Sequence, residues 1–297
     1  MNFAQQIVNA VSLGAIYALF ALGYALVFSV LGVLNLAHSA IFMSGAFFGL
    51  LLLQAGLPLL LAFPLAMIAS GILGGVLERV AFYPLRRRNA PRISQLISSI
   101  GAAILIVNIV QLIFNNLYNS TEQYFPRDLI PTERIQFAGV AIQPIRLLIL
   151  VVALALMVLL QLLVTRTRTG LAMRAVAFDQ RVASLLGINT GQIFLLTFFL
   201  AGALGGAGGL LYGLAFTRVT PFMGQEIALV GLTAIVLGGL GNVQGAVIGG
   251  FIVAALQTFS TAVVSSSYRD AIVFILFFLV LLFRPQGLLG QARQDKV

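Results

Sequence analysis

Long apolar runs separated by shorter polar stretches account for most of the chain. The runs are continuously apolar, unlike the alternating pattern of a half-exposed strand, and most are long enough to cross a bilayer as a helix. We therefore expect an all-α fold, a polytopic membrane helix bundle of about 8 to 10 membrane segments. The runs cover residues 7–31, 36–55, 57–83, 93–118, 145–164, 193–216, 227–240, 246–264 and 271–283.

Some of these runs are interrupted, which predicts broken or re-entrant helices. Residues 32–35 separate the first two runs, and 36–55 fits either a full span or a half-helix that enters from one side. Residues 30–35 and 236–242 share a similar Val-Leu-Gly pattern followed by Asn. Chance and an internal repeat explain that similarity about equally well.

The composition supports a single transmembrane domain over residues 1–297. Hydrophobic residues make up 60% of the chain and charged residues 8%, and the mean hydropathy is +1.07, which excludes a water-soluble protein of this size. Thirty glycines favour a tightly packed helical bundle over a barrel. There is no Cys and one His, so disulfides, thiolate metal sites and His-pair metal sites are excluded.

The net charge of +9 is a topology signal. Arginines and lysines concentrate in three places, at 86–92, in 165–190 and in the C-terminal tail, and such loops stay in the cytoplasm. We expect these segments, including the C-terminus, to be cytoplasmic, while the side of the N-terminus stays open. Because the basic residues occupy short loops and form no continuous face, we expect no nucleic-acid partner.

The polar stretch at 165–190 lies between two apolar runs and carries Asp179 as its one acid. Apolar residues recur there at steps of three and four, which predicts one short amphipathic helix over 170–186 that ends at Gly187. That helix could dock on a cytoplasmic subunit or lie on anionic headgroups. The apolar positions are Leu171, Ala175, Phe178, Val182 and Leu185, and the basic ones are Arg166, Arg168, Arg174 and Arg181.

Several polar residues within or beside the apolar runs are candidates for a transport path. Asn108, Gln111 and Asn115 share one helix face, which suits either interhelical hydrogen bonds or a wet path. Asn35 and His38 fit either a helix break or a path. Glycines spaced by four, at 205, 209 and 213 and at 241, 245 and 249, favour close helix packing.

Motifs for energy conversion or hydrolysis are missing from the sequence. It contains no phosphate-binding loop, no zinc-protease motif and no hydrolase nucleophile motif. No carboxylate lies in the middle of a run; Glu78 is nearest, at a run's edge beside Arg79. We therefore expect no enzymatic activity and no cofactor or metal, with energy supplied by a partner.

Several segments resemble the LivH-type permeases of branched-chain amino-acid ABC importers. Residues 174–189, RAVAFDQRVASLLGIN, resemble that family's cytoplasmic loop for the ATPase, and residues 237–250, LGGLGNVQGAVIGG, its glycine segment. Residues 32–47, 78–86 and 284–290 also match family segments. Leu36 and Ser39 depart from the expected aromatic residue and glycine, so a different neutral substrate stays open.

The resemblance implies a permease subunit of a bacterial importer for branched-chain or other neutral amino acids, in the plasma (inner) membrane. Its implied partners are a second, related permease, two cytoplasmic ATPases, an extracytoplasmic binding protein and membrane lipid. Alternatives are a urea or short-amide ABC permease, or a self-sufficient channel or secondary carrier. The implied ATPase-coupling residues are Gly170, Arg174, Ala175, Asp179, Ala183, Leu186 and Gly187, and the path candidates are Asn35, His38, Asn108, Gln111 and Gln244.

Overall fold

The computed structural model describes residues 3–126, 135–137, 140–263, 268–284 and 286–290. Most of this part of the chain is helical, as predicted, and six helices are long and apolar enough to span a membrane. Three shorter apolar helices, α2, α10 and α12, accompany them. The helices are α1 (Phe3–Leu31), α2 (His38–Gln54), α3 (Leu59–Leu77), the π-helical turn η1 (Glu78–Phe82), α4 (Tyr83–Arg87), α5 (Arg92–Tyr118), α6 (Pro144–Arg166), α7 (Arg168–Phe178), α8 (Gln180–Leu185), α9 (Thr190–Phe216), α10 (Met223–Gly238), α11 (Val243–Val263) and α12 (Arg269–Phe283).

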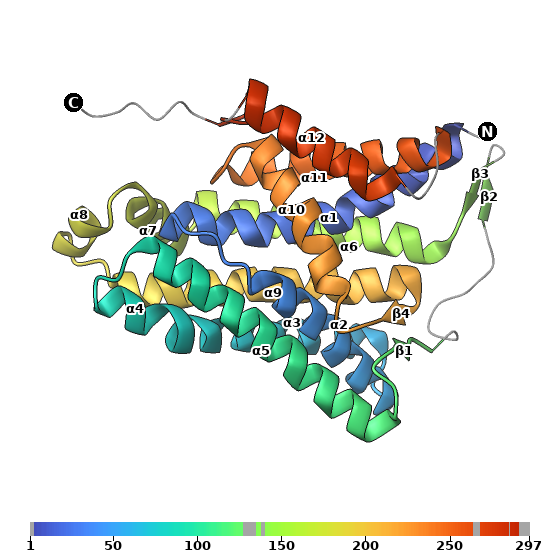
Figure 1. Ribbon diagram of the computed structural model, residues 1–297, viewed down its shortest axis with the longest axis horizontal. Helices are drawn as coiled ribbons and strands as arrows, with labels where there is room; N and C mark the ends of the chain where they lie inside the picture. The colour runs from blue at the N-terminus through green and yellow to red at the C-terminus, as the bar shows by residue number, and fades with distance from the viewer. Residues whose placement is uncertain (1–2, 127–134, 138–139, 264–267, 285, 291–297) are drawn as a thin grey trace.

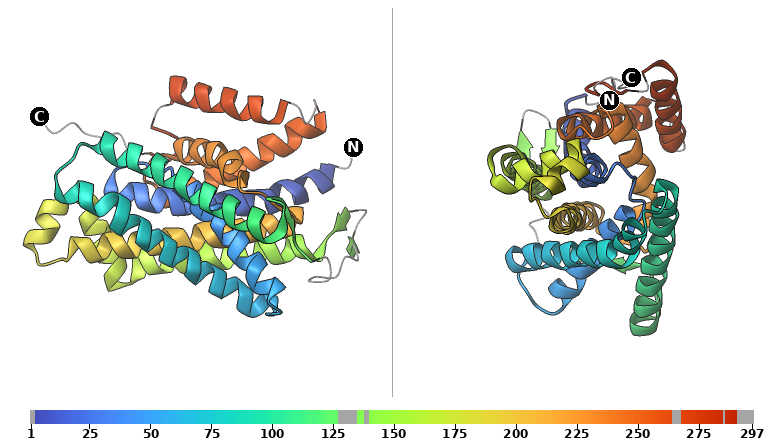
Figure 2. Two further views of the ribbon diagram at one scale, coloured as in Figure 1. Left: turned by 60° about the horizontal axis from the view of Figure 1, so that its bottom comes forward. Right: turned by 90° about the vertical axis from the view of Figure 1, so that its left-hand side faces the viewer.

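Helices α1 and α9 form the centre of the bundle (Figures 1 and 2). Most residues of both helices are buried, and α11, α3 and α2 pack directly against them. Helices α5 and α6 are mostly exposed, and they lie at the periphery. Exposed aliphatic residues on these outer helices are expected for a surface that faces lipid or another membrane subunit.

The polar connections gather at two opposite ends of the bundle (Figure 1). One end, the basic end, holds α4, α7 and α8. The other, the strand end, holds the N-terminus and four short strands. The loop at 86–92 and the stretch at 165–190 therefore share an end, as the positions of their arginines predicted, and the N-terminus lies opposite them. Arg293 and Lys296, counted with the basic tail, lie outside the described residues.

The strand end contains two small antiparallel strand pairs, in stretches that lie between the apolar runs of the sequence. Strand β1 (Gln123–Tyr124) pairs with β4 (Arg218–Val219), with Gln123 opposite Val219. Strand β2 (Ile135–Phe137) pairs with β3 (Val140–Ile142). These strands are too short to produce a periodic signal in the sequence.

Helix α2 begins inside the bundle, after a break that separates it from α1. Gly32, with φ +67°, ends α1, and the Asn35 side chain accepts a hydrogen bond from Ala37 N at 3.2 Å. His38 then lies fully buried between Gly23 of α1 and Gly205 of α9, where an added Cβ on either glycine would lie 2.7 Å from the imidazole. The chain thus returns from the basic end to the interior before α2 starts.

The glycines spaced by four do permit close helix packing, as predicted. A Cβ at Gly209 would lie 1.8 Å from the carbonyl oxygen of Phe42, and one at Gly249 would lie 2.0 Å from that of Ala234. Gly241 is the exception, because it lies in the turn between α10 and α11 with φ +83°. Its neighbours in that pattern, Gly245 and Gly249, are helical.

Candidate coupling segment and transport path

Residues 165–190 form a folded projection at the basic end, which we call the coupling segment (Figure 1). Thr167 begins α7, because its side-chain oxygen accepts a hydrogen bond from Gly170 N at 3.0 Å. Gly170 is buried against the end of α6, and a Cβ there would lie 2.2 Å from the carbonyl oxygen of Leu163. This close approach fixes the direction in which α7 leaves α6.

Asp179 divides the coupling segment into two helices, so the prediction of one helix over 170–186 was wrong. Its backbone is extended, at φ −155° and ψ 112°, and its carboxylate accepts hydrogen bonds from Arg181 N at 2.8 Å and Val182 N at 3.0 Å. Asp179 is therefore the N-cap of α8. Apolar periodicity could not reveal this break, because the spacing of apolar residues continues across it.

The end of the coupling segment is as predicted. Gly187 has φ +83°, and Ile188 N donates to Ala183 O at 3.1 Å, as in a Schellman motif. Asn189 then caps α9 by accepting a hydrogen bond from Gln192 N at 3.1 Å. Four residues, 186–189, thus connect α8 to α9, a central helix of the bundle.

The predicted apolar face of the coupling segment points away from the bundle. Phe178 and Leu185 are each 86% exposed, and Leu171, Val182 and Leu186 are also exposed. The inward contacts come from other residues, chiefly Met173, Val176 and Ala183, which are buried with Val30, Ile193 and Phe194. A sequence pattern identifies an apolar face but does not identify the partner that covers it.

Most of the other residues predicted for coupling are also accessible to solvent. Arg174, Asp179 and Gly187 are exposed, Ala175 is half-buried, and the Arg174 guanidinium donates to Thr165 O at 3.5 Å. Arg174 also lines a cavity of about 440 Å³ that is bordered by α1, α7 and the turn between α10 and α11. The coupling segment is thus held rigidly on its inner side and presents both apolar and basic groups outward.

The first basic loop is anchored beneath the coupling segment by Glu78. This carboxylate is fully buried, and its Oε1 lies 2.5 Å from Nη2 of Arg86. The Arg86 guanidinium in turn stacks on Phe194 of α9, 4.0 Å from the ring centroid. The sequence predicted Glu78 at the edge of a run beside Arg79, but it did not predict that Glu78 is buried. One π-helical turn rotates Glu78 inward, where Arg86 is its close partner.

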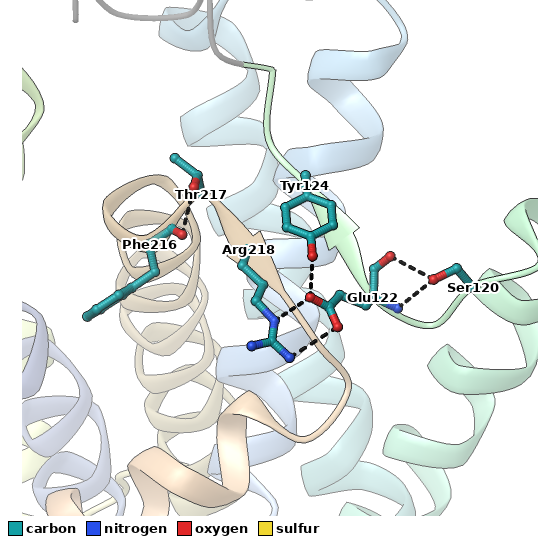
Figure 3. Close-up of polar contacts among 6 residues, drawn as sticks. All are labelled: Ser120, Glu122, Tyr124, Phe216, Thr217 and Arg218. Carbon is teal, nitrogen blue, oxygen red and sulfur yellow. Dashed lines mark hydrogen bonds and ion pairs between the residues drawn. The ribbon is translucent and has the colours of Figure 1, made fainter. Parts of the chain in front are cut away.

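A polar cluster at the strand end was not predicted (Figure 3). Glu122 pairs with Arg218 at 2.6 Å across strands β1 and β4, and Tyr124 donates a hydrogen bond to Glu122 at 2.5 Å. This hydrogen bond raises the pKa of the Tyr124 hydroxyl, since the neutral phenol is the donor. Glu122 and Arg218 are 96 positions apart in sequence, so only the folded structure reveals that they form a pair.

The five path candidates lie in separate places. Asn35 and His38 are buried at the start of α2. Asn108 is exposed and Gln111 half-exposed on the outward side of α5, and the Asn108 side chain donates to Ile104 O at 2.8 Å. Gln244 is exposed in the first turn of α11. Within this one chain they do not form a common site.

A polar cavity between α1, α6, α9 and α11 was also missed by sequence reasoning. It has a volume of about 220 Å³. Arg146 borders it and donates a hydrogen bond to Asn9, and buried Gln257 accepts one from Tyr17 at 2.7 Å. The polar residues that form it come from three helices, α1, α6 and α11, each of which appears mostly apolar in sequence.

Residues 6–281 match the family described as "Branched-chain amino acid transport system / permease component". The chain belongs to this family. It is 36% identical over 305 residues to the high-affinity branched-chain amino acid transport system permease protein BraD of Pseudomonas aeruginosa, covering 100% of the chain and 98% of that protein. It is 34% identical over 306 residues to the LivH permease protein of Escherichia coli K12, with the same coverage.

The fold of this permease is also similar to a solved structure. That structure is titled "PsaBC from Streptococcus pneumoniae in complex with Fab", and the TM-score is 0.51 at 14% sequence identity. The match covers 96% of the permease and 93% of the solved chain. Family membership and fold together establish a transporter component, a multi-pass membrane protein built of helices.

Proposed function

We propose that this permease is the membrane subunit of an ABC importer for branched-chain amino acids, and that its coupling segment docks on a cytoplasmic ATPase. One observation carries the proposal: Phe178, Leu185 and Leu186 form an exposed apolar face among arginines, on a segment whose other side is packed into the bundle. An interfacial helix would instead rest on lipid through that face. The rigid link through Gly187 and Asn189 to α9 favours a surface that transmits movement.

The basic end is the cytoplasmic one in this proposal. The loop at 86–92 and the coupling segment hold most of the arginines, and short basic loops remain in the cytoplasm. The C-terminal tail lies on the same side, and the N-terminus on the outer one. The six long and three shorter apolar helices of the described residues then form one membrane domain of broken and complete segments.

A second, related permease covers α5 in the assembled transporter. Helix α5 exposes Asn108, and beside it Gln111, on a face that would otherwise meet lipid, where polar side chains are unfavourable. Placing this face at a permease–permease interface gives the amino acid a polar path between two subunits. Asn35 and His38 support the broken α2 from behind that path, and Gln244 contributes at the basic end.

The strand end receives an extracytoplasmic binding protein. The Glu122, Tyr124 and Arg218 cluster is exposed and charged, which suits docking of a soluble partner that needs an oriented approach. The relatives' names favour branched-chain amino acids, and nothing among the described residues favours urea. A secondary carrier is disfavoured because the one carboxylate within the six long apolar helices of the described residues, Glu78, is already held by Arg86.

Reconstitution of the permease with its partner permease, two ATPases and binding protein tests the proposal. Uptake of leucine, isoleucine or valine should require ATP, every subunit and the binding protein. Phe178→Ser and Leu185→Ser should lower co-purification of the ATPase and uptake at least several-fold. Val158→Ser, an exposed position on α6 away from the coupling segment, is the matched control. Normal coupling in both coupling-segment variants, or uptake by the permease alone, would overturn the proposal.

A further inference from the structure

An apolar groove runs along the outer surface between α3, η1 and α9. It has a volume of about 590 Å³. Ile72, Val76 and Val80 form one wall, with side chains at least half exposed, and Leu195 and Phe199 belong to the other. These residues face a membrane in a bundle of this kind, so an occupant with apolar chains fits the groove.

Polar groups line the groove only near its basic end. Arg79 lies one turn beyond Val76 on the first wall, and Gln192 lies in the first turn of α9 on the second. From Gln192 to Phe199, and from Arg79 to Ile72, each wall continues for about 10 Å at the rise of a helix. A polar mouth above an apolar floor matches an amphiphile whose headgroup lies at the membrane surface.

The charge at the mouth is positive. Glu78 is held by Arg86 at 2.5 Å, whereas its distance to Arg79 Nε is 3.7 Å, longer than a hydrogen bond. Two arginines thus share one carboxylate, which leaves one positive charge. Arg79 also lies over the Tyr83 ring at 5.2 Å, and its side chain is 47% exposed. The Arg79 guanidinium therefore places a positive charge at the polar end of the groove.

We propose that this groove binds an anionic phospholipid, with the headgroup phosphate at Arg79 and an acyl chain along Ile72, Val76 and Phe199. Arginine binds phosphate well because its planar guanidinium offers several donors at once. The apolar helix of a second subunit would fill the floor but would not use the positive charge at the mouth. The bound lipid contacts the first turns of α9, directly after the coupling segment.

The absence of tryptophan from the chain allows a direct test. Ile72→Trp places a single fluorophore in the groove, and Ile104→Trp places one on α5 at a matched exposure, 56% against 55% for the native side chains. The purified full chain is placed in mixed micelles with brominated phosphatidylglycerol or brominated phosphatidylcholine. Quenching at the groove should favour the anionic lipid by roughly fivefold, the contribution of one arginine near a charged surface, and should show no preference at position 104.

Variants at Arg79 decide whether the preference comes from the proposed contact. Adding Arg79→Gln to Ile72→Trp should abolish the preference, Arg79→Lys should keep most of it, and Arg87→Gln, an equal loss of charge outside the groove, should leave it unchanged. Survival of the preference in Arg79→Gln would overturn the proposal. So would an equal preference at position 104, or a groove tryptophan that neither lipid quenches. The test needs no ATPase, so its failure leaves the proposed transport function untouched.

Discussion

The Arg86 guanidinium lies between Glu78, 2.5 Å from its carboxylate, and the ring of Phe194, 4.0 Å from its centroid. Glu78 and Arg86 belong to the continuous helix that ends in the loop at 86–92, whereas Phe194 lies in α9 and is buried with Met173 and Val176 of α7. One aromatic ring thus joins the loop at 86–92 to the coupling segment. Two basic segments far apart in sequence form one structural unit at the basic end.

Arg86→Gln should destabilise the permease by about 3 to 5 kcal/mol, because it leaves the buried Glu78 carboxylate without its close partner. Adding Glu78→Gln should recover most of that loss by removing the buried charge. Arg87→Gln, an exposed neighbour, should change stability by less than about 0.5 kcal/mol. Thermal unfolding of the purified protein in detergent measures all three. Equal effects at 86 and 87 would show that the buried pair contributes little.

Asp179→Ala should remove the N-cap of α8 and cost about 1 kcal/mol of local stability. Asp179→Asn keeps a capping oxygen and loses the charge, so the pair separates capping from an ion pair with a partner subunit. If capping is the main role, Asn should retain coupling and Ala should lose part of it. ATP hydrolysis by the reconstituted complex is the readout. Loss of coupling in both variants, with stability kept in the Asn variant, would assign Asp179 to the interface.

Substitutions at Gly187 should act through the backbone alone, because a Cβ there meets no atom within 4 Å. Ala should cost about 1 to 2 kcal/mol at this left-handed position, Val more, and Asn less because Asn adopts this region more easily. Coupling efficiency, measured as substrate-stimulated ATP hydrolysis, should fall in the order Gly, Asn, Ala, Val. An Ala variant that couples better than Asn would contradict this account.

Single cysteines in this Cys-free chain should report the two ends of the bundle. Cysteines at Asn89 and Ser184 should be protected from a membrane-impermeant thiol reagent in intact cells, and those at Thr121 and Phe3 should react. Permeabilised cells provide the control, since all four should then be labelled. Labelling at Ser184 from outside would reverse the orientation and remove the basis for ATPase docking.

Much of the fold was predictable because membrane helices depend on hydropathy, which is local. The run at 93–118, for instance, became α5, residues 92–118. The errors arose where single side-chain contacts or tertiary packing decide. The break at Asp179 depends on one side-chain cap, and the inward rotation of Glu78 depends on a π-helical turn. The outward direction of Phe178 and Leu185 depends on which face meets Phe194. Hydropathy does not encode these contacts.

Helix α9 runs for 27 residues, from Thr190 after the cap at Asn189 to Phe216, two residues before Arg218. At 1.5 Å per residue, α9 is about 40 Å long. Its glycines allow close packing against α2 and α3 and do not form a hinge. A tilt of about 5° at one end of such a lever moves the other end by roughly 3 Å. A displacement of the coupling segment would therefore also displace the Glu122–Arg218 pair. Docking at one face of the membrane would in this way move residues at the opposite face.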